Sequence, residues 1–385
     1  MFVRFFSPDA LTCEINEAAK PLPVKQLEEE IARCANTQKA LCVNSATAAL
    51  DLTLRVLGIG EGDEVVVPAY TYTASASPVL HVGATIRFVD TAPGSFHLDY
   101  DMLEAAITEK TKAIIAVDIG GVLCDYDRIY EIAERKKHLF SPKNRLQALY
   151  GRIIVVSDCA HGIGAERNGK RAGEIADFTT FSLRGSEALA ADGGAVTWKA
   201  REGLDSEALY SEYLTLSLQG QSENAAANAW EYDVLSPAYK CSLTNGEASV
   251  ILKRLENREA AAARRHEIIR RYEEAFADLG IRTLAHTGEN FRSSGYLYLT
   301  HIPDTFDGRR RAFIDYMTEK GVAANVHYKP LPMMTAYKNL GFHINDYPRA
   351  YCSYQGEISL PLYASLTDEE VAHVIKTFRD CLTTV

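Results

Sequence analysis

Hydrophobic and polar positions follow two alternating patterns in the first half of the chain. Between Cys42 and Trp198, short runs of apolar, often β-branched residues alternate with stretches in which apolar residues recur three and four positions apart. The first pattern is typical of buried strands, and the second of amphipathic helices. Strands and helices that alternate along the chain predict βαβ units around a largely parallel sheet, and therefore an α/β fold.

Six strands and three helices can be marked in this part of the chain. Each apolar run is bounded by Gly, Pro or Asp, which commonly form the turns at strand ends. The predicted strands span residues 64–68, 85–90, 113–118, 152–158, 177–183 and 194–198, and the predicted helices span 45–57, 100–110 and 126–139.

The pattern changes after residue 198. A polar stretch over 217–230 leads to a helical pattern over 245–280, which we interpret as one long helix that joins two domains. A strand over 296–302 and a helix over 310–321 then predict a smaller α+β unit.

The length of 385 residues favours two domains over one, because single hydrophobic cores stop growing at about 250–300 residues. We predict a large domain over residues 1–240 and a small C-terminal domain over 241–385 that begins with the linking helix. Apolar residues at 47% and charged residues at 24% are ordinary globular values.

The composition narrows the possible partners. No apolar run approaches the roughly 18 residues that a membrane helix needs, and the amino-terminal segment lacks the features of a signal peptide. We therefore expect a cytoplasmic protein with no membrane partner. A net charge of −10 provides no overall basic field, so a nucleic-acid partner is not expected either.

The cysteines and the basic clusters predict little chemistry. The eight cysteines are scattered, without a CxxC pair or a zinc-type spacing, so we expect reduced thiols and no metal site. Two basic clusters, at 264–271 and 308–313, have the composition of anion sites, but charge runs of this kind are usually solvated helix faces. We interpret both clusters as solvated.

Three stretches at strand ends or helix starts carry polar side chains suited to a ligand. In open parallel sheets, ligands bind beyond the carboxyl ends of the strands. NSATAAL (44–50) begins a helix, PAYTYTASAS (68–77) follows a strand with aromatic residues, and SDCAHGIGA (157–165) places a carboxylate after a buried strand. Each stretch alone has an ordinary structural explanation, as a helix cap, a core aromatic or a turn.

Together these motifs resemble a known family. NSATAAL, GDEVVVPAYTYTASA, VDIGG, SDCAHGIGA, FSL…DGGAVTW and NVHYKPLP, in this order, are similar to the sugar aminotransferases of the DegT/DnrJ/EryC1/StrS family. The resemblance implies fold type I of the pyridoxal phosphate (PLP) enzymes, with a mostly parallel seven-stranded sheet and a smaller C-terminal domain. It also implies a homodimer with composite active sites, and a nucleotide-sugar substrate.

The resemblance also implies roles for individual residues. Around the cofactor ring, Tyr72 matches the aromatic residue that stacks on the pyridine, Asp158 matches the carboxylate that pairs with the ring nitrogen, and His161 matches a residue beside the ring. The other matching positions are Ala46 and Thr47 at the phosphate-binding turn, Ser182 as a phosphate contact, Lys240 reaching the partner subunit's phosphate, and His327 and Tyr328 near the sugar.

The Schiff-base lysine of the family has no counterpart in this chain. Alignment from FSL places Glu187 at its position, and alignment backward from Asp192 places Ser186 there. Neither side chain forms an imine, and a carboxylate beside a phosphate opposes cofactor binding. Lys170 and Lys199 are the nearest lysines, but they lie outside the strand-turn-strand segment.

Further departures accumulate. The family's loop of the GWITTGP kind, expected between Ile15 and Leu27, is absent. Asn245-Gly246 stands where the family usually has an Asp-Ile-like pair, and Tyr296 stands where many members have a histidine.

Three hypotheses about function remain open. The first is a catalytically silent or impaired homologue, either as a homodimer or as one subunit of a heterodimer in which it completes the site of an active paralogue. The second is an enzyme that modifies sugars with non-covalently held PLP, or its amine form PMP, and uses Glu187 as a base. The third is an ordinary sugar aminotransferase with a misaligned or mutated lysine. The first two imply a cofactor that is held non-covalently at most, or no cofactor.

Overall fold

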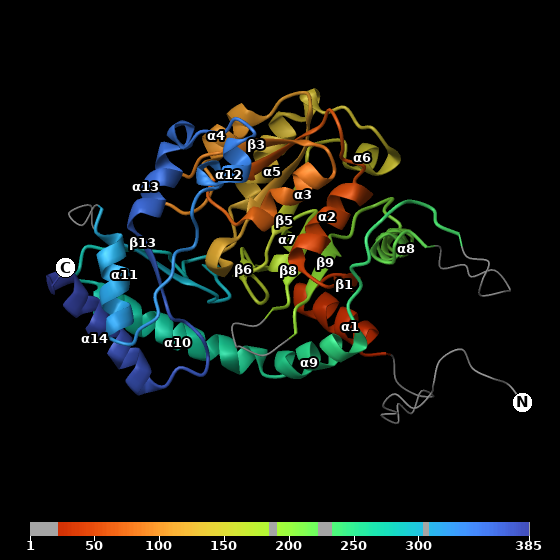
Figure 1. Ribbon diagram of the computed structural model, residues 1–385. Helices are drawn as coiled ribbons and strands as arrows, with labels where there is room; N and C mark the ends of the chain where they lie inside the picture. The colour runs from red at the N-terminus through yellow and green to blue at the C-terminus, as the bar shows by residue number, and fades with distance from the viewer. Residues whose placement is uncertain (1–21, 185–190, 222–232, 303–307, 385) are drawn as a thin grey trace, which may run out of the picture.

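A seven-stranded sheet forms the centre of the molecule (Figure 1). The computed structural model describes residues 22–184, 191–221, 233–302 and 308–384. The sheet has the order β1-β9-β8-β5-β4-β2-β3. Its strands are β1 (Ala40–Val43), β2 (Glu64–Pro68), β3 (Thr85–Val89), β4 (Thr111–Val117), β5 (Ile154–Asp158), β8 (Phe178–Ser182) and β9 (Gly194–Trp198).

The sheet is parallel except for one strand. β9 is antiparallel to both of its neighbours, β1 and β8, and the other neighbouring strands pair in parallel. The predicted α/β class with a mostly parallel seven-stranded sheet is therefore confirmed. All six predicted strands are present, and the seventh is the short edge strand β1.

Helices cover both faces of this sheet. Successive strand residues point to opposite faces, so the apolar strands present side chains to a separate core on each face. Val65 and Val67 of β2 belong to one core, and Val66 between them belongs to the other. The first core includes α2 (Ala46–Val56), α3 (Ser77–His81), α6 (Arg145–Tyr150) and α8 (Ser206–Ser217). The second includes α1 (Pro23–Ala35), α4 (Tyr100–Ala106), α5 (Tyr126–Arg135), α7 (Ala172–Ile175) and α9 (Asn245–Leu255).

A smaller sheet with its own core follows in the chain. β10 (Arg282–Thr283), β12 (Tyr298–His301) and β13 (Glu357–Leu360) pair in the order β10-β12-β13. Helices α10 (Arg258–Phe276), α11 (Arg310–Glu319) and α14 (Asp368–Thr384) pack on it around a third core. A further small sheet joins β11 (Phe291–Arg292), β6 (Glu166–Arg167) and β7 (Lys170–Arg171).

The predicted linking helix over 245–280 is two helices. α9 ends at Leu255 and α10 begins at Arg258, with Asn257 between them at φ −102° and ψ 10°. Asparagine has a low helix propensity, which is consistent with a break at this position.

The segment between β12 and β13 returns to the large sheet. α12 (Thr335–Lys338) and α13 (Pro348–Gly356) lie in it, and Phe88 of β3 packs edge-on against Tyr337, Phe342 and Tyr347. The division into domains at residue 240 stays a prediction.

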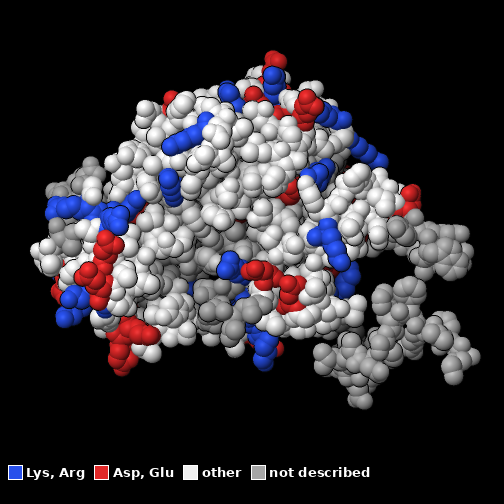
Figure 2. All heavy atoms as spheres, in the orientation of Figure 1, with Lys and Arg blue, Asp and Glu red and all other residues white. Residues whose placement is uncertain are grey.

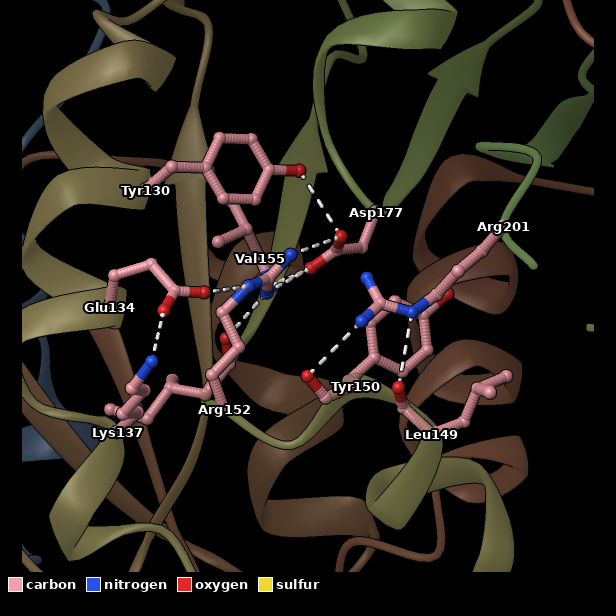
Figure 3. A network of polar contacts seen from close by, with 10 residues as sticks. Tyr130, Glu134, Lys137, Leu149, Tyr150, Arg152, Val155, Asp177 and Arg201 are labelled. Atoms are coloured by element: carbon pink, nitrogen blue, oxygen red, sulfur yellow. Dashed lines mark hydrogen bonds and ion pairs between the residues drawn. The ribbon is translucent and has the colours of Figure 1, made fainter. Parts of the chain in front are cut away.

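An ion pair holds two strand starts at the amino-terminal edge of the large sheet (Figure 3). Arg152 Nη1 and Nη2 lie 2.7 and 2.8 Å from the Asp177 carboxylate oxygens, and both side chains are buried. Asp177 also accepts hydrogen bonds from the Val155 backbone N–H at 2.9 Å and from the Tyr130 hydroxyl at 3.2 Å. The pair therefore joins the start of β5 to the start of β8.

Candidate active site

The candidate site lies at the opposite, carboxyl edge of the large sheet, where β5 ends at Asp158. This carboxylate is 6% exposed. Its Oδ2 accepts a hydrogen bond from Ser75 Oγ at 2.6 Å, and its Oδ1 accepts one from the Ala160 backbone N–H at 3.3 Å. Among the described side chains, no lysine, arginine or histidine forms an ion pair with Asp158.

Burial raises the pKa of Asp158 above its ordinary value, and the two hydrogen bonds offset this only in part. A buried carboxylate without a counter-charge is stabilised by any cation placed beside it. Asp158 is therefore prepared for a positively charged ligand group.

Tyr72 directly precedes the 3-10 helix Thr73–Ser75, whose last residue donates to this carboxylate. Its side chain is 56% exposed, which is high for a large aromatic residue. Its ring centroid lies 5.5 Å from that of Tyr328, with the rings tilted by 39°. Ser75 connects Tyr72 to Asp158, because Ser75 ends the short helix that follows Tyr72 and its hydroxyl donates to Asp158.

His161 follows three residues after Asp158 and packs between two tyrosines. Its ring stacks on Tyr296, with centroids 4.3 Å apart and planes 14° apart, and its Nε2 lies 3.3 Å from the Tyr328 hydroxyl. The Gly120 backbone N–H donates to Nδ1 at 3.3 Å, so a neutral ring carries its proton on Nε2. Burial, and secondarily His327, lower the pKa of His161 to about 3. The ring is therefore neutral at physiological pH.

The start of α2 provides free backbone donors at the same edge. Ser45 caps this helix by accepting from the Ala48 N–H at 3.1 Å, and the N–H groups of Ala46 and Thr47 lie in the first turn, where the helix offers no acceptor. Free amides and the helix dipole favour an anion at such a position.

Gly194 brings the strand edge close to this helix start. A Cβ atom at Gly194 would lie 2.1 Å from the carbonyl carbon of Ser45 and 2.4 Å from the nitrogen of Ala46. Gly194 is also the strand partner of Ser182, whose Oγ accepts from the Arg184 N–H at 3.4 Å. Ser182 and the start of α2 therefore lie on either side of one strand.

His327 and Tyr328 reach the site from the segment that precedes β13. Tyr328 contacts both Tyr72 and His161, as described above. His327 Nδ1 lies 2.8 Å from Ser359 Oγ, and the carbonyl of His327 accepts from the Tyr70 hydroxyl at 2.9 Å. Five of the nine predicted binding residues thus lie together: Tyr72, Asp158, His161, His327 and Tyr328. Three others lie along the same edge of the sheet: Ala46, Thr47 and Ser182.

Lys240 lies apart from this group within one chain. It is exposed and bridges to Leu218 at the end of α8. A role across a dimer interface stays a prediction.

Neither of the two alternative lysines forms a hydrogen bond or an ion pair with Asp158 in the described part of the chain. Lys199 follows β9 at the amino-terminal edge, where its amine lies 5.8 Å from the centroid of Tyr130 (ring labelled in Figure 3). Lys170 is exposed in β7 of a separate small sheet. Glu187, Ser186 and most of the segment between Ile15 and Leu27 fall outside the residues that the structure describes.

An arginine-lined cavity of about 960 Å³ adjoins the site. His161, Ser182 and Tyr296 line it together with Arg254, Arg264, Arg265 and Arg292. The interpretation of the 264–271 cluster as a solvated face is therefore wrong for its first two arginines. Arg265 donates to the carbonyls of Gly295 and Ser294 at 3.0 and 3.1 Å, which holds it against the cavity wall.

Among the other basic residues, Arg270 and Arg311 behave as predicted, whereas Arg310 is half-buried against Tyr354, with its guanidinium carbon 4.0 Å from the ring centroid. Arg270 pairs with Glu274 on an exposed face, and Arg311 is 92% exposed. Basic and acidic side chains are interspersed over the face in Figure 2.

Sequence reasoning missed Ser75, Glu357 and the cavity arginines. Ser75 lies within the predicted aromatic stretch 68–77, but only the fold shows that it bonds Asp158. The spacing of Arg258 and Arg265, seven residues or two turns apart on α10, was one available signal, because residues at this spacing share a helix face.

Fold and site are those of an α/β protein with a polar site at the carboxyl edge of its sheet, and comparison with known proteins identifies its family. Residues 22–379 match the model of the DegT/DnrJ/EryC1/StrS aminotransferase family, and the chain belongs to this family. The resemblance inferred from the motifs is thus confirmed.

Named relatives act in sugar metabolism. The spore coat polysaccharide biosynthesis protein SpsC of Bacillus subtilis is 32% identical over 378 residues, which cover 96% of this chain and 92% of that protein. GDP-perosamine synthase of Caulobacter vibrioides is 30% identical over 354 residues, covering 91% of this chain and 88% of the synthase.

Solved structures confirm the fold. A putative sugar aminotransferase from Streptococcus pneumoniae is 46% identical in its PLP form, with a TM-score of 0.90 over 95% of this chain and 92% of that one. The same protein in its PMP form has a TM-score of 0.91 at 45% identity, with the same shares covered. The architecture is that of the fold type I PLP aminotransferases.

The described residues fit the ring and phosphate of such a cofactor. The uncompensated Asp158 suits a protonated pyridine nitrogen, the exposed Tyr72 ring suits a flat heterocycle, and the free amides of Ala46 and Thr47 suit a phosphate. A covalent anchor is not among the described residues at this edge. No helix of the described residues is long and apolar enough to cross a membrane.

Proposed function

We propose that this chain is a sugar aminotransferase homologue that keeps a site for PLP or PMP, lacks the lysine tether, and is impaired in transamination on its own. The buried, unpaired carboxylate of Asp158 carries the first part of this proposal. Such a group costs stability unless a ligand cation compensates it, so its presence favours a retained cofactor site.

The impairment follows from Glu187 or Ser186 at the lysine position. When bound, the cofactor would supply an electron sink, and the protein must then move a proton. A general acid or base contributes roughly 10²–10⁴-fold to such a step, and loss of the tether adds to the deficit.

The other two hypotheses receive less support. An ordinary aminotransferase with a misaligned lysine would need Lys170 or Lys199 at the site, and both lie elsewhere. Use of Glu187 as a base would need a carboxylate beside the cofactor phosphate, which opposes binding.

We further propose that this chain pairs with a second subunit, either its own copy or an active paralogue, and donates Lys240 to that subunit's phosphate site. The exposure of Lys240 away from its own site supports this arrangement. Co-expression with a lysine-bearing paralogue, read by native mass spectrometry, tests it. Exclusive homodimers would rule out the heterodimer.

Cofactor binding tests the main proposal directly. Purified protein should bind PMP and PLP in equilibrium dialysis, and borohydride should leave no pyridoxyl group on any lysine. Asp158→Asn, which keeps the size of the side chain and removes its charge, should weaken PMP binding about tenfold or more, as expected for one lost buried charge pair. Asp315→Asn, at an exposed carboxylate of α11 that does not line the cavity, serves as the matched control.

Two results would contradict the proposal. A reduced pyridoxyl adduct on a lysine would establish an ordinary tether. Absence of any binding, in protein with a normal unfolding transition, would show that the site no longer holds a cofactor.

A further inference from the structure

A second buried carboxylate lies behind His327 and is not matched by any motif of the resemblance. Glu357 is the first residue of β13 and is fully buried. Its Oε2 accepts the backbone N–H of His327 at 2.9 Å, and its Oε1 accepts the Ser359 hydroxyl at 2.5 Å. Ser359 Oγ in turn lies 2.8 Å from His327 Nδ1. The three side chains form one continuous chain.

The hydroxyl of Ser359 has a single proton, so the two ends of this chain depend on each other. When Glu357 is ionised, Ser359 must donate to it, and Ser359 can then only accept from a protonated His327 Nδ1. When Glu357 is protonated, it donates to Ser359, and Ser359 donates to an unprotonated His327 Nδ1. In a neutral imidazole the remaining proton must then lie on Nε2.

The proton balance of the change is simple. Starting from protonated Glu357 and His327 with its proton on Nε2, one proton passes from Glu357 to Ser359 while another passes from Ser359 to Nδ1. This gives a carboxylate and an imidazolium with no change in the total number of protons. Loss of the Nε2 proton to solvent or to a ligand then leaves Nε2 with a free electron pair.

The surroundings of Glu357 place its protonation equilibrium within a pH range that can be measured in the folded protein. Burial raises the pKa of Glu357 to about 8, although Ser359, the His327 N–H and Arg310 of α11 all oppose the rise. The other titratable groups nearby include His301 of β12, which pairs in register with Glu357, and Tyr70, whose hydroxyl donates to the His327 carbonyl. Tyr328 also interacts with Glu357, and His161 with His327. Burial lowers the pKa of His327, so the neutral ring prevails.

We propose that Glu357 and Ser359 are positioning residues that set the tautomer of His327, so that its Nε2 is a hydrogen-bond donor when Glu357 is protonated and an acceptor when Glu357 is ionised. His327 Nε2 forms no hydrogen bond with any other described residue, and the next residue, Tyr328, contacts Tyr72 and His161. The switch therefore acts on an atom beside the candidate site. Only its effect on a bound sugar rests on the proposed function.

Substitution of Glu357 by Gln should hold His327 in the tautomer that carries its proton on Nε2 at every pH. The His327 backbone N–H needs an acceptor and holds the amide oxygen, so the NH₂ group faces Ser359 and donates to it at every pH. Ser359 then donates to Nδ1, and Nε2 keeps its proton. Ser359→Ala removes the hydroxyl that connects Glu357 to His327 Nδ1, and it leaves the Glu357 carboxyl group in place.

The test is the tautomer of His327 in the full-length protein without added ligand, read from ¹H–¹⁵N correlations of ¹⁵N-histidine-labelled protein and assigned with His327→Gln. In the wild type, Nε2 should change from the protonated to the unprotonated ¹⁵N shift as the pH rises from 6 through about 8. In Glu357→Gln it should keep the protonated shift over the same range. In Ser359→Ala the change should no longer follow Glu357.

A chemical measurement provides a second readout. Diethyl pyrocarbonate attacks an unprotonated imidazole nitrogen, so carbethoxylation of His327, mapped by mass spectrometry, should be at least tenfold slower in Glu357→Gln than in the wild type at pH 9. Equal tautomers and equal rates in both proteins would overturn the proposal. That result would leave PMP binding through Asp158 unaffected, so the two proposals fail separately.

Discussion

At the scale of single residues, two buried carboxylates have opposite relations to their surroundings. Asp158 accepts two hydrogen bonds at an open edge and has no counter-charge among the described residues. Glu357 is enclosed and is bonded on both oxygens by groups of one hydrogen-bonded chain. The first is suited to an external cation, and the second to holding or releasing a proton.

Glu187→Lys is expected to restore a covalent link. A primary amine at this position can reach the cofactor aldehyde if the alignment from FSL is correct, and transamination should then rise by about 10²-fold or more. Borohydride trapping followed by peptide mapping is the measurement. Glu187→Gln removes the charge without adding an amine, so it should bind PLP somewhat better and trap none. Trapping in Ser186→Lys but not in Glu187→Lys would favour the shorter alignment.

Glu357→Gln should change how stability depends on pH. The pKa of Glu357 rises from an ordinary 4.5 to about 8 on folding, so the folded state binds more protons than the unfolded state between these values. The free energy of unfolding of the wild type therefore falls as the pH rises through this window. The variant lacks this group, so its stability relative to the wild type should increase from pH 5 to pH 8 in urea titrations. A constant difference would contradict the raised pKa.

At the scale of elements, the contact between β9 and the start of α2 shapes the predicted phosphate site. Gly194 lets the strand approach the backbone of Ser45 and Ala46 more closely than any side chain permits. The helix can then present its free amides at the strand edge, beside Ser182.

Gly194→Ala should displace the start of α2. The new Cβ would lie 2.3 Å from the Ser45 carbonyl oxygen, and this backbone cannot rotate away as a side chain could. We expect a loss of about 1–3 kcal/mol in the free energy of unfolding, as for other overpacked sites, together with weaker PMP binding. Denaturation and equilibrium dialysis measure the two effects.

Gly246→Ala is the matched control. The nearest neighbouring atom to a Cβ at this position, Thr244 Oγ1, would lie 4.0 Å away, and alanine favours the helix more than glycine does. Equal losses in the two variants would show that the tight contact at Gly194 has no special role.

At the scale of the whole molecule, the large sheet separates a stabilising edge from a functional edge. The amino-terminal edge holds the buried Arg152–Asp177 pair, and the carboxyl edge holds Asp158. β5 connects them, because Arg152 precedes this strand and Asp158 ends it.

Asp177→Ala should destabilise the entire fold. It leaves a buried guanidinium without its partner, and removal of one member of such a pair typically costs about 3–5 kcal/mol. Thermal unfolding should shift to a markedly lower temperature, while protein that remains folded keeps its affinity for PMP. Asp315→Ala, in the exposed pair with Arg311, should leave the unfolding temperature unchanged. Similar shifts in the two variants would contradict the argument.

Local patterns were sufficient for most of the fold. Runs such as EVVVP appear as strands at almost the predicted bounds, because a strand buried on both faces needs a continuous apolar run. β1, with only four residues at the sheet edge, was too short to give such a signal. The break between α9 and α10 was missed, although residues 256–259 (ENRE) contain no apolar residue that would continue the helical pattern.

The sequence by itself determined the fold class, the family, and the residues closing β5 and β8, since each depends on residue type and order along the chain. Only the tertiary structure decided that Ser75 bonds Asp158, that Arg264 and Arg265 face a cavity, and that Glu357 lies behind His327. These relations join residues that are distant in the chain, or depend on which way a helix face turns. Both the contacts between distant residues and the orientation of a helix face depend on how whole elements pack. Local sequence patterns contain no information on that packing.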